Sequence, residues 1–396
     1  MRPGTASDAE EVARQAGLLA AAWSPAGAPS SWRLTAAQFE TLRDDAELTA
    51  IATTIPLDRL PPLLFTAAAT FLILELEPRP LRSWFPRVGV PQPPLDPSFP
   101  AAYRDFCLDH RDQLLRLCAR HRYQMNEVGR CADVVPALTP VVAEDRDVVL
   151  VDVGTGAGLG LHVDRYRYLY RERDGSRRGV GDARAPLTIE VEVRGDVPPP
   201  LPPALPRIVD RVGLDIEPLD LAAPGVLAWL AACVPQEIGA VTRFHRAAQI
   251  ARSHPARTLR GDTGELLPAV LDDIDAGRLV CIVDTYVHVF FPMDELERFR
   301  ALVDAAGARR DLDWISIDPL VPMGPEATQT VLGIPVPDDL VERNRREGIF
   351  GVVGRLTYRN GRRAAALLGL AHPGAAWLEW LPDVNDVRLA RRGVGR

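Results

Sequence analysis

The sequence predicts an α/β protein in which a mostly parallel, Rossmann-like sheet with a C-terminal antiparallel hairpin follows an all-helical domain. Up to residue 140, apolar residues recur at the three- and four-residue spacing of amphipathic helices. From Asp147 onward, short β-branched runs alternate with helical stretches, which is typical of parallel βαβ units. Near the end, Asn360-Gly361 separates two alternating runs and predicts a hairpin. We therefore expect two domains, residues 1–140 and residues 141–396.

The N-terminal domain is expected to be helical near residues 8–22, 35–54, 59–76, 101–121 and 124–140. A proline-rich connector, Pro86 to Pro100, interrupts the set. Two domains suit a chain of 396 residues, because single cores stop growing near ~250–300 residues. We expect the helical domain to cap a pocket and to select the substrate.

The second domain is expected to contain five parallel strands and then the hairpin strands Gly351–Tyr358 and Arg363–Leu370. Helices are predicted at 222–253, 264–275 and 293–306. The five strands are Val148–Val153, Arg207–Ile216, Arg257–Arg260, Leu279–Asp284 and Asp313–Ile317. This order is typical of class I methyltransferases, in which the last strand inserts antiparallel into the sheet. A plain dinucleotide-binding domain would continue with βα units instead.

An insert of about residues 165–206 separates the first two strands. Tyr166–Arg171 and Leu187–Val193 alternate like strands around a turn at Asp174-Gly175. A proline run from Pro198 to Pro206 follows. We expect an inserted β-ribbon with a stiff linker.

Composition excludes several classes of function. A net charge of −7 argues against nucleic acid as the main partner. All 46 basic residues are arginine, whereas Walker-type phosphate loops and Schiff-base enzymes need a lysine. The five cysteines form no Cys-x-x-Cys pair and no cysteine–histidine array, so we predict no metal site and reduced thiols.

No segment predicts a membrane span or a secretory signal. The longest apolar run, Leu63–Leu74, is shorter than the ~20 residues needed to cross a bilayer. The N-terminus is acidic at Asp8-Ala-Glu-Glu11 and lacks a basic-then-apolar pattern. We expect a soluble, cytoplasmic protein that does not contact a membrane.

The first strand ends in a glycine-rich loop, Asp152-Val-Gly154-Thr-Gly156-Ala-Gly158. Alternate glycines let the backbone pass close to a ligand and turn sharply into a helix whose N–H groups face it. The fingerprint Gly-x-Gly-x-x-Gly is absent, because its third glycine would fall on Leu159 or Leu161. The loop resembles motif I of methyltransferases, which bind S-adenosylmethionine and use the carboxylate near the strand end to orient the methionine portion. A turn that binds nothing is the alternative.

Acidic residues follow the later strands, where nucleoside sites form in such sheets. Asp215, after the second strand, is the candidate for the ribose hydroxyls. The insert places it about three times farther from the loop than the usual ~20 residues, so Asp174 and Asp196 are alternatives. Asp262, after the third strand, is the candidate for the adenine amino group, although it or Thr263 could equally cap the next helix.

The fourth strand ends in Asp284-Thr-Tyr286-Val-His288, where such enzymes present residues to the substrate. Asp284 and Tyr286 are therefore candidate catalytic residues. His288 has a weaker claim, because a core or surface histidine is commoner.

Five stretches resemble a bacterial family known as domain of unknown function 2332. They are Gln124–Cys131, Asp152–Gly158, Asp164–Tyr168, Gly213–Asp220 and Arg260–Asp262. The resemblance runs over most of the chain. The family is similar to class I methyltransferases in its second half, so the resemblance implies that fold and leaves the reaction open.

Two of these stretches suggest further site residues. Asn126, Glu127 and Arg130 would share one helix face, where Asn126 and Arg130 suit the cofactor carboxylate and Glu127 is a candidate base. An exposed intrahelical ion pair is the alternative. Tyr166 and Tyr168 would share one face of the ribbon, where an aromatic ring could stabilise a sulfonium by about 0.5–2 kcal/mol. Tyr166 is therefore a further candidate catalytic residue. A half-buried ribbon with a solvated arginine face explains the same pattern.

The leading hypothesis is a transferase that uses S-adenosylmethionine to methylate a small molecule. Catalysis would rest on alignment, with Asp284, Glu127 or Tyr286 removing the proton. One alternative is intramolecular displacement of methylthioadenosine from the same cofactor. A non-catalytic nucleoside-binding protein on this scaffold is another, because a fold does not dictate a function.

Overall fold

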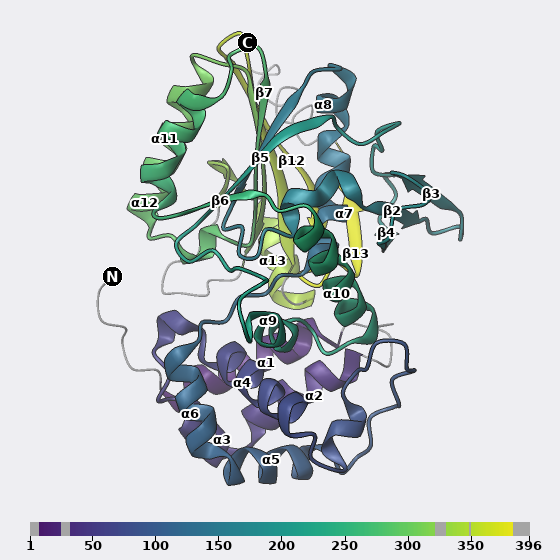
Figure 1. Cartoon of the computed structure of the whole chain (residues 1–396), viewed down its shortest axis with the longest axis vertical. Coiled ribbons are helices and arrows are strands. Elements are labelled where there is room, and N and C mark those ends of the chain that lie inside the picture. Colours follow the sequence, from purple (N-terminus) through teal and green to yellow (C-terminus); the bar gives the residue numbers. More distant parts are fainter. Residues whose placement is uncertain (1–7, 25–31, 321–329, 348–349, 383–396) are drawn as a thin grey trace. The chain divides into compact units, whose positions relative to one another are not determined.

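The computed structural model describes residues 8–24, 32–320, 330–347 and 350–382, whose contacts form two compact units (Figure 1). The helical unit comprises the described residues up to Glu127, together with Leu221–His245 and residues 343–347. The sheet unit comprises the remaining described residues. Residues 128–140 thus belong to the sheet unit, whereas the sequence pattern groups them with the N-terminal helices.

The helical unit is centred on α4 (Pro61–Leu76), which begins at a proline and is apolar on nearly every face. A segment from the middle of the chain packs on it, with the rings of Phe71 and Trp229 5.8 Å apart. The other helices are α1 (Ala9–Ala22), α2 (Arg33–Asp44), α3 (Ala46–Ala52), α5 (Phe99–Asp109), α6 (Arg111–Arg120), α9 (Val226–Cys233) and the start of α10 (Ile238–Ser253).

Four predicted helices are divided. The stretch 101–121 forms α5 and α6, and the stretch 222–253 forms α9 and α10. Asp45 ends α2 and caps α3 by accepting from the N–H groups of Glu47 and Leu48, so 35–54 is not continuous. Residues 121–127 are not helical. The remainder of 124–140 breaks into a 3₁₀ turn (Val128–Arg130), α7 (Cys131–Val134), another 3₁₀ turn (Val135–Leu138) and α8 (Thr139–Ala143). Pro136 and Pro140 each remove a helical N–H donor from this stretch.

The described part of the sheet unit contains a sheet in the order β3-β2-β4-β13-β12-β11-β8-β7-β1-β5-β6. Its parallel strands are β1 (Val148–Val153), β5 (Ile208–Asp215), β6 (Arg257–Arg260), β7 (Leu279–Thr285) and β8 (Leu312–Pro319). Their carboxyl ends are in register, since Val153 pairs with both Leu214 and Asp284. The predicted α/β class with a methyltransferase-like strand order is confirmed.

The predicted hairpin is β11 (Gly351–Arg359) and β12 (Arg362–Ala371), joined by Asn360-Gly361 with positive φ at both residues. The strand that lies antiparallel beside β8 is β11, the first of the hairpin. The expectation that the last strand inserts there is therefore wrong. The last strand, β13 (Trp377–Trp380), instead pairs with the outer side of β12.

The insert extends the main sheet and is not a separate ribbon. The turn at Asp174-Gly175 joins β2 (Arg167–Arg171) to β3 (Arg177–Val180), an antiparallel partner that the pattern missed. The predicted second strand of the ribbon is β4 (Thr188–Arg194), which lies parallel to β2. Strand β4 also pairs with β13, which joins the insert to the hairpin. Sequence alternation identifies strands but not their distant partners, so this pairing could not be predicted.

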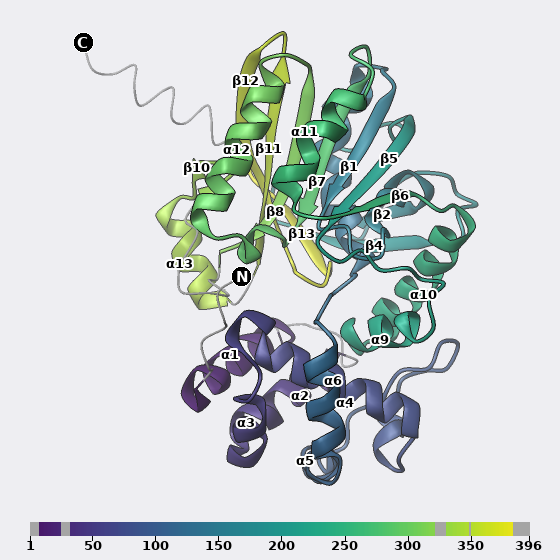
Figure 2. The ribbon, with the colours of Figure 1, turned by 60° about the vertical axis from the view of Figure 1, so that its left-hand side comes forward.

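Helices cover both faces of the sheet (Figures 1 and 2). Helices α11 (Thr263–Asp273) and α12 (Met293–Gly307) lie on one side, and α7 and α8 lie on the other. The buried rings of Phe299 and Trp314 meet edge-to-face at 5.2 Å and join α12 to β8. Between β8 and β11 come β9 (Thr330–Val331), β10 (Ile334–Pro335) and α13 (Asp338–Glu347), which no pattern predicted. Among the described residues, every helix is too short or too polar to cross a membrane.

Candidate active site

The glycine-rich loop leaves β1 in a conformation that requires glycine. Gly154, Gly156 and Gly158 have φ angles of 69°, 54° and 73°, in the left-handed region that glycine enters without steric cost. A Cβ atom on Gly154 would also lie 2.4 Å from Cγ2 of Val287. The glycines selected from the sequence are therefore demanded by the backbone of this turn.

The N–H groups of this loop are largely bonded within the protein. Gly154 and Thr155 donate to the Leu214 carbonyl at 2.8 and 3.2 Å, and Gly158 donates to Thr155 at 2.8 Å. The Gly156 N–H donates to Oδ2 of Asp215 at 2.8 Å. A pyrophosphate-binding loop needs such N–H groups for phosphate oxygens. This loop therefore suits a ligand without phosphates.

The loop does not continue into the predicted α-helix. Gly160–Arg165 forms a 3₁₀ segment that is interrupted by non-helical angles at His162. Asp164 and Arg211 hold this segment against β5 through two hydrogen bonds of 3.0 Å. The site thus lacks the helix N-terminus that attracts anions in dinucleotide-binding folds.

Asp215 ends β5 and closes the loop. Its Oδ2 accepts from Gly156 and its Oδ1 accepts from the Glu217 N–H at 2.8 Å. Each carboxylate oxygen has a second lone pair, so both can still accept from a ribose hydroxyl. The next side chain, Ile216, is 71% exposed and offers an apolar surface that sequence analysis missed. The alternatives Asp174 and Asp196 lie in the insert, where Asp174 caps its own turn and Asp196 pairs with Arg173.

Asp262 follows β6 and is exposed. It is the N-cap of α11, since Oδ1 accepts from the Glu265 N–H at 3.2 Å. The capping alternative is therefore present, and it leaves Oδ2 available to an adenine amino group. The Gly261 N–H donates to the Asp215 carbonyl at 3.0 Å, which brings the two candidate nucleoside carboxylates to neighbouring strand ends.

Asp152, near the end of β1, is strongly affected by its surroundings. Burial raises the pKa of its carboxyl group to about 7, although the hydrogen bond from Thr155 lowers that pKa. The negative charges of Asp215 and Asp284 add to the increase. The Thr155 hydroxyl donates to Oδ2 at 2.7 Å. A cationic ligand beside Asp152 would stabilise the ionised carboxylate and lower its pKa. An ammonium or a sulfonium group would have this effect.

Asp284 is completely buried at the end of β7. Its carboxylate accepts from the Trp314 indole and from the Ser316 hydroxyl, the latter at 2.8 Å. Burial raises the pKa of Asp284, His288 opposes the increase and Asp318 adds to it. Asp284 is thus present at the predicted strand end, held in a fixed orientation by two donors from β8.

His288 belongs to this cluster, although its sequence signal is weak. Its Nδ1 lies 2.7 Å from Oδ2 of Asp318, and its Nε2 lies 3.5 Å from Oδ2 of Asp284. Burial alone would lower the pKa of His288, but the two carboxylates outweigh burial and raise it. Within the described residues, His288 Nε2 and Asp318 Oδ1 are buried without a hydrogen-bond partner. Asp318 was missed because only the pairing of β7 with β8 brings it to His288.

The sequence predicts no metal site, yet the cluster around His288 consists of side chains that can bind metal ions. Asp284, His288 and Asp318 bring possible ligand atoms within 4.8 Å of one another. However, Trp314 and Ser316 already direct donors at Asp284, and the positive charge of Arg300 acts on both carboxylates. A cation would have to displace or oppose these groups, so the arrangement favours a protonated imidazole at its centre.

Tyr286 and Arg130 lie together in the sheet unit. The Arg130 guanidinium is 4.1 Å from the centre of the Tyr286 ring, and its Nε donates to the Pro373 carbonyl at 3.0 Å. Tyr286 has a φ of 59°, which is rare for an aromatic residue and is commonly found at functional sites. Burial raises the pKa of its hydroxyl group despite the opposing effect of Arg130.

The predicted helix face of Asn126, Glu127 and Arg130 is not formed. Asn126 and Glu127 precede the 3₁₀ turn that contains Arg130, and they belong to the helical unit. Glu127 is buried and accepts from Nε of Arg243 at 3.1 Å. The ion pair named as the alternative therefore exists, but its partner is Arg243.

Tyr166 is a core residue. Its side chain is fully buried and its hydroxyl donates to the Leu159 carbonyl at 2.7 Å. Tyr168 and Tyr170 on the same strand face are also fully buried and donate to backbone carbonyls at 2.7 Å. These contacts do not support the predicted catalytic role of Tyr166, and they match the alternative of a buried aromatic face.

Comparison with protein-family models gives a match over residues 9–380. The model is described as "Uncharacterized protein conserved in bacteria", domain of unknown function 2332. The chain belongs to this family. The resemblance noted from its motifs is confirmed over nearly the whole sequence.

Solved structures also resemble this chain. One is magnesium protoporphyrin IX methyltransferase from Synechocystis PCC 6803 with bound S-adenosylmethionine, at 13% identity and a TM-score of 0.22, over 69% of this chain and 97% of that one. The same enzyme with bound S-adenosylhomocysteine gives 13% identity and a TM-score of 0.22, over 67% and 96%. A search of the curated proteins finds no match.

Proposed function

We propose that the protein is a methyltransferase that binds S-adenosylmethionine at the carboxyl edge of β1, β5 and β6 and acts on a small molecule. The observation that carries this proposal is the loop after β1. Its three left-handed glycines permit close approach of a ligand, while the N–H groups of Gly154, Thr155, Gly156 and Gly158 are bonded internally and leave no phosphate cradle. In open α/β sheets, ligands bind at this edge.

The side chains along this edge fit a nucleoside with a cationic tail. We assign Asp215 to the ribose hydroxyls, the exposed Ile216 to the apolar face of adenine and Asp262 to the adenine amino group. Asp152 would accept from the methionine ammonium group, which favours the ionised carboxylate. We retain Arg130, which belongs to the sheet unit, as a proposed ligand of the methionine carboxylate.

When bound, the cofactor supplies a methyl group activated by its sulfonium centre. The chain contributes alignment and a destination for the proton that leaves the nucleophile. With His288 protonated, the cluster Asp284–His288–Asp318 carries a net charge of −1 and can take up one proton. Asp284 pairs with Val153 at the end of β1, and Tyr286 comes two residues later, so we assign proton transfer to Asp284 and positioning of the acceptor to Tyr286. Glu127 is a poor base because Arg243 already neutralises it.

The experiment is incubation of the purified full chain with S-adenosylmethionine and a fractionated extract of small molecules, followed by mass spectrometry. The proposal expects S-adenosylhomocysteine together with a product that is one methylene unit heavier than its substrate. Asp284→Asn should lower the rate about 10²–10⁴-fold and leave cofactor affinity nearly unchanged. Methylthioadenosine formed from the cofactor alone would replace this proposal with intramolecular displacement. Binding without any product would indicate a nucleoside-binding protein.

A further inference from the structure

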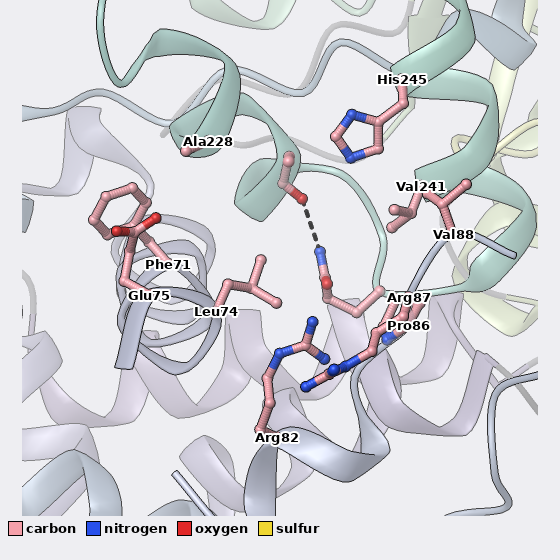
Figure 3. Close-up of a pocket in the computed structure, with 12 residues that line it drawn as sticks. Phe71, Leu74, Glu75, Arg82, Pro86, Arg87, Val88, Ala228, Val241 and His245 are labelled. Carbon is pink, nitrogen blue, oxygen red and sulfur yellow. Dashed lines mark hydrogen bonds between the residues drawn. The ribbon is translucent and has the colours of Figure 1, made fainter. Parts of the chain in front are cut away.

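The helical unit contains a cavity of about 340 Å³ (Figure 3). It lies between α4, the segment that follows the 3₁₀ turn Leu81–Trp84, and the α9–α10 region. Its volume is at the lower end of the ~300–1,000 Å³ typical of small-molecule sites. Every residue that lines it belongs to the helical unit.

Two guanidinium groups meet at one end of this cavity. Figure 3 shows the side chains of Arg82 and Arg87 extending to the same region. The Arg82 side chain is only 11% exposed, and its Nη1 donates to the Phe85 carbonyl at 3.0 Å. Its Nε is buried without a hydrogen-bond partner among the described residues. Arg82 is thus a buried charge at the cavity that its hydrogen bonds do not fully satisfy.

The charge on Arg82 is poorly compensated. Glu77 approaches its Nε to only 3.6 Å, is 56% exposed and is shared with Arg87 at 3.1 Å. Burial lowers the pKa of Arg82, and the positive charge of Arg87 lowers it further. A carboxylate in the cavity would reduce the repulsion between the two guanidinium groups, since guanidinium groups match carboxylates in geometry and charge.

The remaining walls are mainly apolar. Phe71 and Leu74 from α4 face Val241 from α10 across the cavity, and Val88 is 54% exposed at its margin. Gln236 is not available to a ligand through its amide nitrogen, which donates to the Ala231 and Val234 carbonyls at 3.0 and 2.8 Å. Figure 3 shows Glu75 beside Phe71, at a distance from the arginines. That carboxylate disfavours a second negative charge on the apolar part of a ligand.

We propose that this cavity binds a small organic monocarboxylate with an apolar tail, the carboxylate on Arg82 and Arg87 and the tail against Phe71 and Leu74. The proposal is independent of the methyltransferase site. A neutral molecule would not offset the repulsion between Arg82 and Arg87, and an inorganic anion would leave the apolar walls exposed to water.

Isothermal titration calorimetry of the full chain with sodium octanoate tests the proposal. We expect octanoate to bind saturably at one site, and octanol and octylamine to show no comparable binding. Arg82→Gln should bind octanoate about tenfold or more weakly, because it loses the charged partner of the carboxylate. Shortening octanoate to hexanoate should weaken binding by roughly fourfold per buried methylene. Arg116→Gln is the matched control, because Arg116 is exposed on α6 and does not line the cavity. This variant should bind octanoate with the same affinity as the wild type.

Far-UV circular dichroism and thermal melting establish that each variant is folded. If Arg82→Gln does not fold, Arg87→Gln takes its place, since Arg87 lies at the exposed margin. The proposal is overturned if octanoate gives no saturable binding, if octanol binds as tightly as octanoate, or if the folded arginine variant binds octanoate as the wild type does.

Discussion

At the scale of single residues, the candidate site is a set of buried or partly buried carboxylates, each stabilised differently. Asp215 is stabilised by backbone N–H groups and Asp284 by an indole and a hydroxyl. Asp318 is stabilised by His288. Asp152 has one hydroxyl donor, and burial raises its pKa to about 7. Asp152 is therefore the carboxyl group whose charge should depend most on ligand binding.

The stability of the protein should report this raised pKa through Asp152→Asn. The unfolded chain releases the Asp152 proton near the ordinary pKa of 3.8, whereas the folded chain holds it to about 7. Between these values the folded state binds more protons, so the Asp152 contribution to stability falls as pH rises from about 4 to 7. Urea unfolding at several pH values should show the wild type losing stability relative to Asp152→Asn across that range. A pH-independent difference would exclude the raised pKa.

At the scale of elements, the loop after β1 combines backbone geometry with close packing, and two glycines separate these effects. Both glycines have a left-handed φ, 69° at Gly154 and 83° at Gly175. A Cβ atom on Gly154 would lie 2.4 Å from Cγ2 of Val287, whereas a Cβ atom on Gly175 would have no atom within 4 Å. We expect Gly175→Ala to cost about 1–2 kcal/mol and Gly154→Ala a further 1–3 kcal/mol, measured by urea unfolding. Val287→Ala should partly rescue Gly154→Ala. Equal losses in the two alanine variants would argue against the packing contribution.

The start of α11 has a capping function that can be separated from ligand binding. Asp262→Ala should lose about 1 kcal/mol of stability, because the Glu265 N–H loses its acceptor. Asp262→Ser restores a capping oxygen but not the carboxylate. If Asp262 also binds adenine, both variants should weaken cofactor affinity, whereas only Asp262→Ala should lower stability. Full cofactor affinity in Asp262→Ser would limit this residue to capping.

Sequence patterns predict the central elements well because those elements are locally determined. The buried run Val148–Val153 and the hairpin turn Asn360-Gly361 each carry their own signal. Apolar spacing predicts one helix over residues 124–140, whereas Pro136 and Pro140 divide this stretch in the structure. The Asn126, Glu127 and Arg130 face failed with that helix.

At the scale of the whole molecule, distant pairings decide what local patterns cannot. His288 and Asp318 meet because β7 and β8 are adjacent, and the insert joins the sheet through β13. The segment Leu221–His245 packs with N-terminal helices more than a hundred residues earlier in the chain. Helical periodicity shows that this segment has an apolar face but not which unit covers it.

The most direct test of the account is calorimetric titration of the full chain with S-adenosylmethionine, compared with NAD and with Asp215→Ala. We predict saturable binding of S-adenosylmethionine, no comparable binding of NAD to a loop whose N–H groups are largely bonded internally, and clearly weaker cofactor binding by folded Asp215→Ala. No binding of S-adenosylmethionine by the wild type, or preferred binding of NAD, would contradict the central claim.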